Sequence, residues 1–287
     1  MDEDAEGPAD PAGARVACIQ AAAEPDGAVC SIVLAEDGET FESYLFRHAS
    51  LDRPGDLLYR APGWFRALLI APDGARLVVD TDGVLHHDRG GAWTQEPVTG
   101  GVGLNDLKLV DGMLHAAADD GTVWRLATGG WRSLGRARAT LYALDGPAAS
   151  ELYAAGDEGV AVRLDGGRVR DLSLPTDAPL TSVLTAPSGQ TYIAGESGAL
   201  FVGRGAVWHE VPDWDGNVYG LAWYRGRLVL AAAERGVWAF DGTSFAALRD
   251  DLDAASVTAT DRYLCVAADD QVWRFDGRNW RQRRFHF

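Results

Sequence analysis

Lysine, cysteine and long apolar runs are scarce in this sequence of 287 residues. No stretch reaches the roughly 18 consecutive apolar residues of a membrane-spanning helix, which argues against a helical membrane protein. The three cysteines lack C-x-x-C spacing, and their odd number, without a secretory signal at the start, argues against a disulfide framework. We therefore expect a cytoplasmic protein in which Cys30 and Cys265 are buried thiols, because both lie within apolar runs.

Positive charge is also scarce. Lys and Arg number 26 against 42 Asp and Glu, which gives a net charge of −16, and Lys108 is the only lysine. Nucleic acids and anionic membranes are disfavoured as partners because their phosphates would be repelled, whereas a basic partner is favoured. Residues 1–14 carry five acidic residues and no base, so we expect a disordered acidic tail before a single domain over residues 15–287.

Helical periodicity and the common catalytic and metal-binding motifs are absent as well. The sequence contains no G-x-S-x-G, Walker A or dinucleotide fingerprint. His86 and His87 are adjacent in a strand-like run, where neighbouring side chains point to opposite faces and do not easily chelate one metal. "DTDG" at 80–83 and "DWDG" at 213–216 supply only two carboxylates each, short of a calcium loop. We therefore expect no cofactor and no metal site.

The sequence contains instead one unit repeated seven times. Each copy runs through apolar and small residues into a turn with at least one acidic residue before the anchor, which is glycine in six copies, as in "LHAAADDG" and "LYAAGDEG". The anchors, spaced 45, 38, 38, 39, 38 and 35 residues apart, are Gly38, Gly83, Gly121, Gly159, Gly198, Gly236 and Gln271. Nine or ten residues after six of them stands a bulky apolar marker: Trp93, Trp131, Val169, Trp208, Phe245 and Trp280.

Each unit contains four short β-rich runs separated by Asp-Gly or Gly-Gly turns, which are hairpin signals. Four antiparallel strands in about 40 residues are typical of a propeller blade, so the sequence predicts an all-β, seven-bladed β-propeller. Small residues in the second run permit close approach near the axis, and the marker rings fill the wedges between blades. Strands near 15–22 and 280–286 predict that blade 1 packs on blade 7 without a shared blade.

The units "LHAAADDGTVWRLATGGW" and "LYAAGDEGVAVRLDGG" resemble the repeats of bacterial WD-repeat-like, YVTN and Asp-box (BNR-like) propellers, including photosystem II assembly-factor-like proteins. The resemblance covers residues 15–287 and implies the fold but no single function, because such propellers include enzymes and scaffolds. The sialidase Asp-box is only partly matched: "DRGGAW" keeps its Asp, Gly and Trp, whereas "FDGTSF" and "FDGRNW" are one residue short. Sialidase-like chemistry would also need an arginine cluster, a Tyr/Glu pair and an axial acid, and no such site is distinct.

Acidic residues fill most of the two positions before each anchor. Eleven of these fourteen positions are acidic: Glu36, Asp37, Asp82, Asp119, Asp120, Asp157, Glu158, Glu196, Glu234, Asp269 and Asp270. In a propeller, these turns emerge on the same face as the loops that link the blades, which is the usual recognition face of the resembling families. Turn chemistry explains an Asp next to the glycine better than it explains the position before it. Both a turn-only role and a partner-binding acidic rim therefore stay open.

Three aromatic residues of the predicted loops, Trp64, Trp214 and Tyr219, are candidate partner contacts because Trp and Tyr are favoured at hot spots. The alternative is that each ring folds back onto its own blade. Together with the acidic face they predict a non-enzymatic interaction module that binds a basic protein, such as an immunity protein that sequesters a basic toxin, or an assembly scaffold. The alternative function is a hydrolase or lyase resembling Asp-box glycosidases, with its site at the axial mouth.

Overall fold

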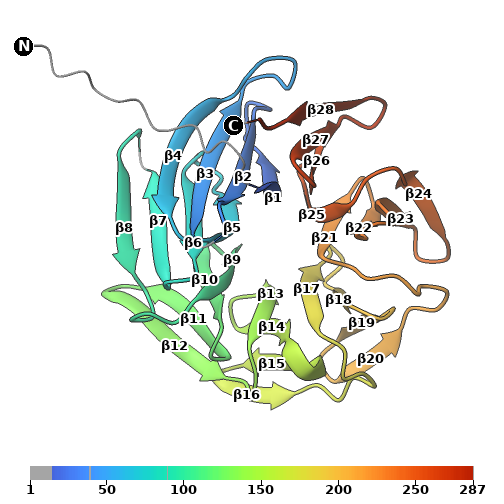
Figure 1. The fold of residues 1–287 in the computed structure, drawn as a ribbon. Coiled ribbons are helices and arrows are strands. Elements are labelled where there is room, and N and C mark those ends of the chain that lie inside the picture. Colours follow the sequence, from blue (N-terminus) through green and yellow to red (C-terminus); the bar gives the residue numbers. More distant parts are fainter. Residues whose placement is uncertain (1–14, 39, 89, 287) are drawn as a thin grey trace, which may run out of the picture.

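Seven four-stranded antiparallel sheets surround a central axis in the computed structural model, which describes residues 15–38, 40–88 and 90–286 (Figure 1). The predicted seven-bladed β-propeller is confirmed. The predicted acidic tail, residues 1–14, lies outside the described residues. In the part of the chain that the structure describes, no helix is long and apolar enough to cross a membrane.

Strands follow one another in chain order within each sheet, with the first strand nearest the axis. Blade 1 comprises β1 (Arg15–Ala23), β2 (Val29–Glu36), β3 (Phe41–His48) and β4 (Asp56–Pro62). Blade 2 comprises β5 (Phe65–Ile70), β6 (Arg76–Asp80), β7 (Val84–Asp88) and β8 (Trp93–Pro97). Blade 3 comprises β9 (Leu104–Val110), β10 (Met113–Ala118), β11 (Thr122–Ala127) and β12 (Gly130–Arg136). Blade 4 comprises β13 (Leu141–Ala148), β14 (Glu151–Gly156), β15 (Ala161–Asp165) and β16 (Arg168–Asp171), with the 3₁₀ turn η1 (Asp157–Gly159) between β14 and β15.

The remaining blades repeat this arrangement. Blade 5 comprises β17 (Leu180–Thr185), β18 (Thr191–Gly195), β19 (Leu200–Arg204) and β20 (Val207–Glu210). Blade 6 comprises β21 (Gly220–Tyr224), β22 (Arg227–Ala231), β23 (Val237–Phe240) and β24 (Phe245–Arg249). Blade 7 comprises β25 (Ala254–Ala259), β26 (Leu264–Ala268), β27 (Gln271–Phe275) and β28 (Trp280–Arg284).

The hydrophobic core is divided into seven clusters, one between each pair of neighbouring blades. The marker rings occupy these wedges as predicted: Trp93 of blade 2 stacks on Tyr59 of blade 1 at 4.4 Å, and Trp208 of blade 5 meets Tyr153 of blade 4 at 5.4 Å between ring centroids. Small side chains fill the second strands, where Ala116 is fully buried. The aromatic markers therefore act as packing residues, which is the role that the sequence indicated.

The ring closes between blade 1 and blade 7, each of which is complete (Figure 1). Thr258 Oγ1 on β25 donates a hydrogen bond of 2.6 Å to the carbonyl of Ala21 on β1. Cys18 and Cys265 are buried in the apolar cluster between these blades. The predicted burial of Cys30 and Cys265 is confirmed, and burial raises the pKa of both thiols to about 12, which makes them poor nucleophiles at neutral pH.

The anchor glycine is required by the link that passes over it. Gly159 has a φ of +64°, a conformation that favours glycine, and a Cβ on it would lie 2.2 Å from the carbonyl oxygen of Thr176. Thr176 belongs to the link between blades 4 and 5, so the turn after the second strand packs directly against the chain that enters the next blade. This contact places the acidic turns and the blade links on one face.

Candidate functional site: the axial mouth

The two acidic positions of each turn lie in different surroundings. The backbone N–H of the first position donates to the residue that precedes the innermost strand of the same blade, as in Asp119 to Gly103 (2.9 Å) and Asp157 to Thr140 (3.0 Å). The second position lies near arginines at the end of the outermost strand or in the link that enters the blade. The repeated turn thus directs one carboxylate toward the axis and the next one outward.

Arginines at the ends of outermost strands, and one in a blade link, neutralise several of the outer carboxylates. Arg136 lies 3.7 Å from Asp120, Arg138 lies 2.6 Å from Glu158 and Arg284 lies 3.2 Å from Asp270. In blade 1, Asp37 has a turn role instead, because its Oδ1 accepts hydrogen bonds from the hydroxyl and the backbone N–H of Thr40. Asp82 is exposed and makes no ion pair with any described residue. Turn chemistry and local ion pairs therefore account for most of the outer set.

The inner carboxylates have no such neutralisation. Among the described residues, none of the six acids at the first turn position forms an ion pair within 4.0 Å: Glu36, Asp119, Asp157, Glu196, Glu234 and Asp269. Their contacts are to neutral donors, as where Asn105 Nδ2 donates to Asp119 (2.8 Å) and the hydroxyl of Tyr219 lies 3.5 Å from Glu196. Turn formation alone does not explain this set.

These carboxylates contribute to raised pKa values of two tyrosines at the axis. Burial, then the charges of Asp157, Asp119 and Glu196, raise the pKa of the Tyr142 hydroxyl. Burial, then Glu196, Glu234 and Asp253, raise that of Tyr219. Asp253 itself has a raised pKa because of its burial and the nearby charges of Asp269 and Glu234. We call these six acids the mouth carboxylates: Asp119, Asp157, Glu196, Glu234, Asp253 and Asp269.

The three aromatic candidates take three different positions. Trp214 is buried, 8% exposed, with its Nε1 donating 2.9 Å to the Gly216 carbonyl and its ring 4.9 Å from that of Phe245. The ring of Trp214 thus folds back onto the protein and is not available as a partner contact. Trp64 is half-buried under the guanidinium of Arg66, whereas Tyr219 is 40% exposed at the mouth. Of the three, Tyr219 has the surface that a partner could cover.

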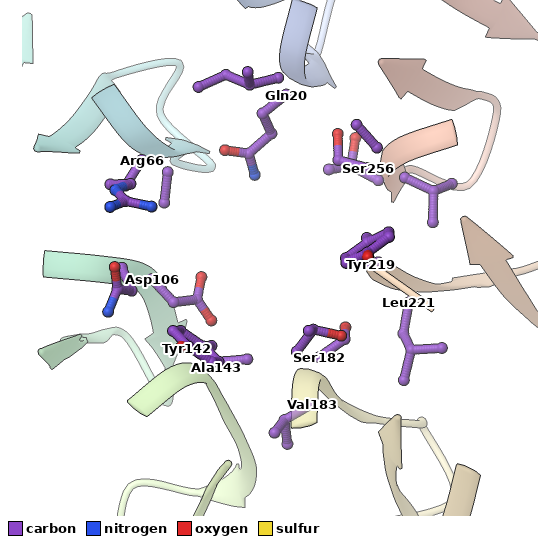
Figure 2. Close-up of a pocket in the computed structure, with 18 of the residues that line it drawn as sticks. Gln20, Arg66, Asp106, Tyr142, Ala143, Ser182, Val183, Tyr219, Leu221 and Ser256 are labelled. Carbon is purple, nitrogen blue, oxygen red and sulfur yellow. The ribbon is translucent and has the colours of Figure 1, made fainter. Parts of the chain in front are cut away.

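A polar cavity of about 210 Å³ lies on the axis beneath the mouth (Figure 2). Six of the seven innermost strands contain a register shift that leaves one extra residue, and every extra residue lines this cavity: Ile19, Arg66, Asn105, Tyr142, Thr181 and Ala255. The following residue lines it as well, for example Gln20, Asp106 and Ser182. A β-bulge re-aims side chains, and each bulged blade contributes at least two consecutive residues to the cavity.

Sequence reasoning did not find these cavity residues. Their signal is chemical diversity at one repeat position, the residue after the buried Leu or Phe that opens the strand: Arg66, Asn105, Tyr142 and Thr181. Hydrogen bonds between neighbouring inner strands hold the ring together below the mouth. Gln20 Oε1 accepts from the backbone of Leu68 (2.5 Å), and Asp106 Oδ2 accepts from that of Leu144 (3.0 Å).

The histidine pair and the calcium-like loops have local structural roles. His86 is buried and lies 2.7 Å from Asp80, whereas His87 contacts Thr94 on the other face of the strand. Asp80 also accepts the backbone N–H groups of the turn that follows, and Asp215 pairs with Arg235. Within the described ranges, no three His, Cys, Asp or Glu side chains gather as a metal-ion site.

The cavity contains only part of a glycosidase constellation. Tyr219 and Glu196 are neighbours, and Asp106 supplies a carboxylate on the axis. Arg66 is the only arginine among the described residues that line the cavity, so the arginine cluster of a sialidase-like site is not assembled. The arrangement offers charge, hydrogen-bond donors and two phenol rings, which are means of binding.

The fold and the mouth together define a seven-bladed β-propeller in which acidic turns surround a polar axial cavity. Among solved structures, the WD40 β-propeller domain of Doa1 is similar at a TM-score of 0.72 with 14% identity, over 93% of this chain and 98% of that one. Saccharomyces cerevisiae Sqt1 is similar at 0.63 with 16% identity, over 94% and 85% of the two chains. YCF48 bound to D1 peptide is similar at 0.59 with 10% identity, over 77% and 80%. At these identities the likeness supports the fold.

One curated protein is similar to part of this chain in sequence. The chain is 29% identical over 142 residues to the immune protein Tsi7 of Pseudomonas aeruginosa. The match covers 45% of this chain and 46% of that protein, so it spans about half the length of each. No protein-family model matches the chain, and the resemblance to the YVTN, Asp-box and photosystem II assembly-factor-like propellers stays a prediction.

Proposed function

We propose that this propeller is a non-enzymatic, cytoplasmic interaction protein whose acidic face binds a basic protein, and that it acts as an immunity protein against a basic toxin. The observation that carries the proposal is the set of mouth carboxylates, which crowd one another without an ion pair to any described Arg, Lys or His. Such a set is unfavourable in the free protein and becomes favourable against a cationic surface.

The partial match to an immune protein supports the choice of partner class. A cognate toxin must be bound tightly and quickly, and complementary charge accelerates association. Tyr219, exposed at the mouth and beside Glu196, supplies an amphipathic ring of the kind favoured at protein interfaces. Trp64 lies at the same face, partly exposed beneath Arg66.

A pull-down with matched variants tests this proposal. The inner pair Glu196→Gln/Glu234→Gln removes two mouth charges, and the outer pair Asp120→Asn/Glu158→Gln removes two that local arginines neutralise. We expect the wild type and the outer pair to recover a basic protein at low salt, and the inner pair and high salt to lose it. Equal recovery by both variants, or recovery that salt does not change, would contradict an acidic binding face.

A growth assay separates immunity from scaffolding. The recovered partner is expressed alone, with the wild-type propeller and with the inner-pair variant. We expect growth inhibition that the wild type relieves and the inner pair does not. A partner that is harmless when expressed alone would overturn the immunity role while leaving the binding face in place.

A further inference from the structure

The axial cavity presents polar groups that the fold does not use. Ser182 is nine-tenths buried, and its hydroxyl has no hydrogen-bond partner among the described residues. Ser256 Oγ is buried in the cavity wall and is also unpartnered. Gln20 uses Oε1 for the backbone of Leu68, and its amide nitrogen extends into the opening (Figure 2). A buried polar atom without a partner is costly, so Ser256 Oγ, with the free donors of Ser182 and Gln20 in the same cavity, indicates a ligand.

Opposite charges face the cavity from neighbouring blades. Arg66 of blade 2 enters no ion pair with a described residue, and its contact is with the face of Trp64. Asp106 of blade 3 has its two oxygens fixed by the backbone N–H groups of Leu107 and Leu144, which holds the carboxylate toward the axis (Figure 2). The site is therefore preorganised to receive an anionic and a cationic group at the same time.

The charge balance at the mouth restricts what can enter. The mouth carboxylates repel a simple anion, and Arg66 and Lys108 in the cavity wall repel a simple cation. Asp106, and then Asp145, raise the pKa of Lys108, so this lysine stays charged. A molecule with both charges and no net charge meets neither barrier.

We propose that the axial cavity binds a small zwitterion, a free α-amino acid, with its carboxylate at Arg66 and the Gln20 amide and its ammonium group at Asp106. The hydroxyls of Ser182 and Ser256 complete the hydrogen bonds on the opposite wall. The cavity volume of about 210 Å³ suits a ligand smaller than the usual drug-sized occupant. Binding of the amino acid does not require the proposed protein partner, although Tyr219 of the mouth also lines the cavity.

Thermal unfolding of the full chain with the twenty L-amino acids at millimolar concentration tests the site. Each amino acid is compared with the amine that lacks its carboxylate and the acid that lacks its amino group. We expect at least one amino acid to raise the Tm in a saturable way and its two truncated forms to leave it unchanged. No shift with any amino acid, or an equal shift with the amine or the acid, would overturn the proposal.

Variants assign the binding to the cavity. Arg66→Gln and Ser182→Ala should each weaken the apparent affinity of the responding amino acid, about tenfold for the charged contact. Arg136→Gln, which removes a guanidinium of the outer rim, should bind like the wild type. The Tm of each variant without ligand shows that it is folded. Unchanged affinity in Arg66→Gln would place the bound amino acid elsewhere and refute the assignment.

Discussion

Charged side chains form ion pairs in the cluster between blades 1 and 2, whereas those at the axial mouth do not pair with any described residue. At the hairpin end of blade 1, Glu24 is 6% exposed and its carboxylate lies 2.6 Å from Arg47 and 2.5 Å from Arg76. Those arginines in turn reach Asp26 and Asp88 at 2.5 and 2.7 Å. At the mouth, on the face opposite these hairpins, six carboxylates gather without any ion pair to a described residue.

The comparison distinguishes charged groups that stabilise the fold through ion pairs from charged groups that have no ion-pair partner in it. The Glu24 cluster joins three strands of two blades, and each of its charges has a partner, which is the condition for burying ions. At the mouth, burial and then the charges of Asp269 and Glu234 raise the pKa of Asp253, so its charged form is disfavoured there. A cationic surface would relieve this repulsion, which supports the proposed binding of a basic protein.

Breaking the paired cluster should have the largest effect. Glu24→Gln leaves Arg47 and Arg76 without their shared carboxylate, and we expect the free energy of unfolding to fall by about 3 to 5 kcal/mol, as measured by urea denaturation. The folded fraction should still recover the basic partner. A loss below about 1 kcal/mol would show that the cluster is not structural.

Acid should weaken the seam between blades 1 and 7 through His48. Burial, and then the charge of Arg283, lower the pKa of His48 to about 4, so the unfolded chain takes up a proton below pH 6.5 that the folded chain refuses until about pH 4. Protonation of His48 therefore leaves the free energy of unfolding unchanged above pH 6.5 and lowers it by up to about 3 kcal/mol between pH 6.5 and pH 4. The ring contacts Phe285 of blade 7 at 5.6 Å between centroids.

Urea denaturation of two histidine variants between pH 7 and pH 4 measures the contribution of His48 to this pH dependence. His48→Leu removes the titrating ring, and the exposed His209→Leu is the matched control. The pH dependence of unfolding should flatten in the first and stay as in the wild type in the second. Equal slopes in all three proteins would refute the assignment to His48.

The repeat made the fold predictable, because each blade carries its own signals. The positive φ and tight contact of Gly159 and the wedge packing of Trp93 and Trp208 are properties of one blade and its neighbour, repeated at fixed spacing. The acidic turns were visible for the same reason. Their division into inner and outer positions depends on which strand end or blade link each side chain faces, and tertiary packing decides that.

The cavity and the Glu24 cluster could not be read from spacing. Arg66 and Tyr142 face the axis because an inner-strand bulge re-aims them, and no residue type marks that bulge. Glu24 meets Arg47 and Arg76 across 23 and 52 residues of sequence, through sheet register and blade packing. Contacts of this kind depend on the assembled ring.

Within the mouth itself, binding should separate the two sets of carboxylates. Glu196→Gln/Glu234→Gln is expected to weaken the affinity for the basic partner at least about tenfold, or about 1.4 kcal/mol, whereas Asp120→Asn/Glu158→Gln changes it less than about twofold. Titration calorimetry at two salt concentrations measures both, and the salt dependence should decrease in the inner variant alone. An equal loss of affinity in the outer variant would contradict a separate binding role for the inner carboxylates.

The smallest effects should have opposite signs in the two sets. Glu158→Gln removes an exposed ion pair with Arg138, so the free energy of unfolding should fall by about 0.3 kcal/mol. Asp253→Asn removes a carboxylate that Asp269 and Glu234 repel, and it should raise that free energy by a similar amount of about 0.3 kcal/mol. Because the folded-state pKa of Asp253 is raised, its penalty exists at neutral pH and disappears in acid, so the gain should vanish near pH 3. Urea denaturation of both variants at pH 7 and pH 3 decides this point, and a loss of stability in Asp253→Asn at pH 7 would mean that the mouth charges support the fold after all.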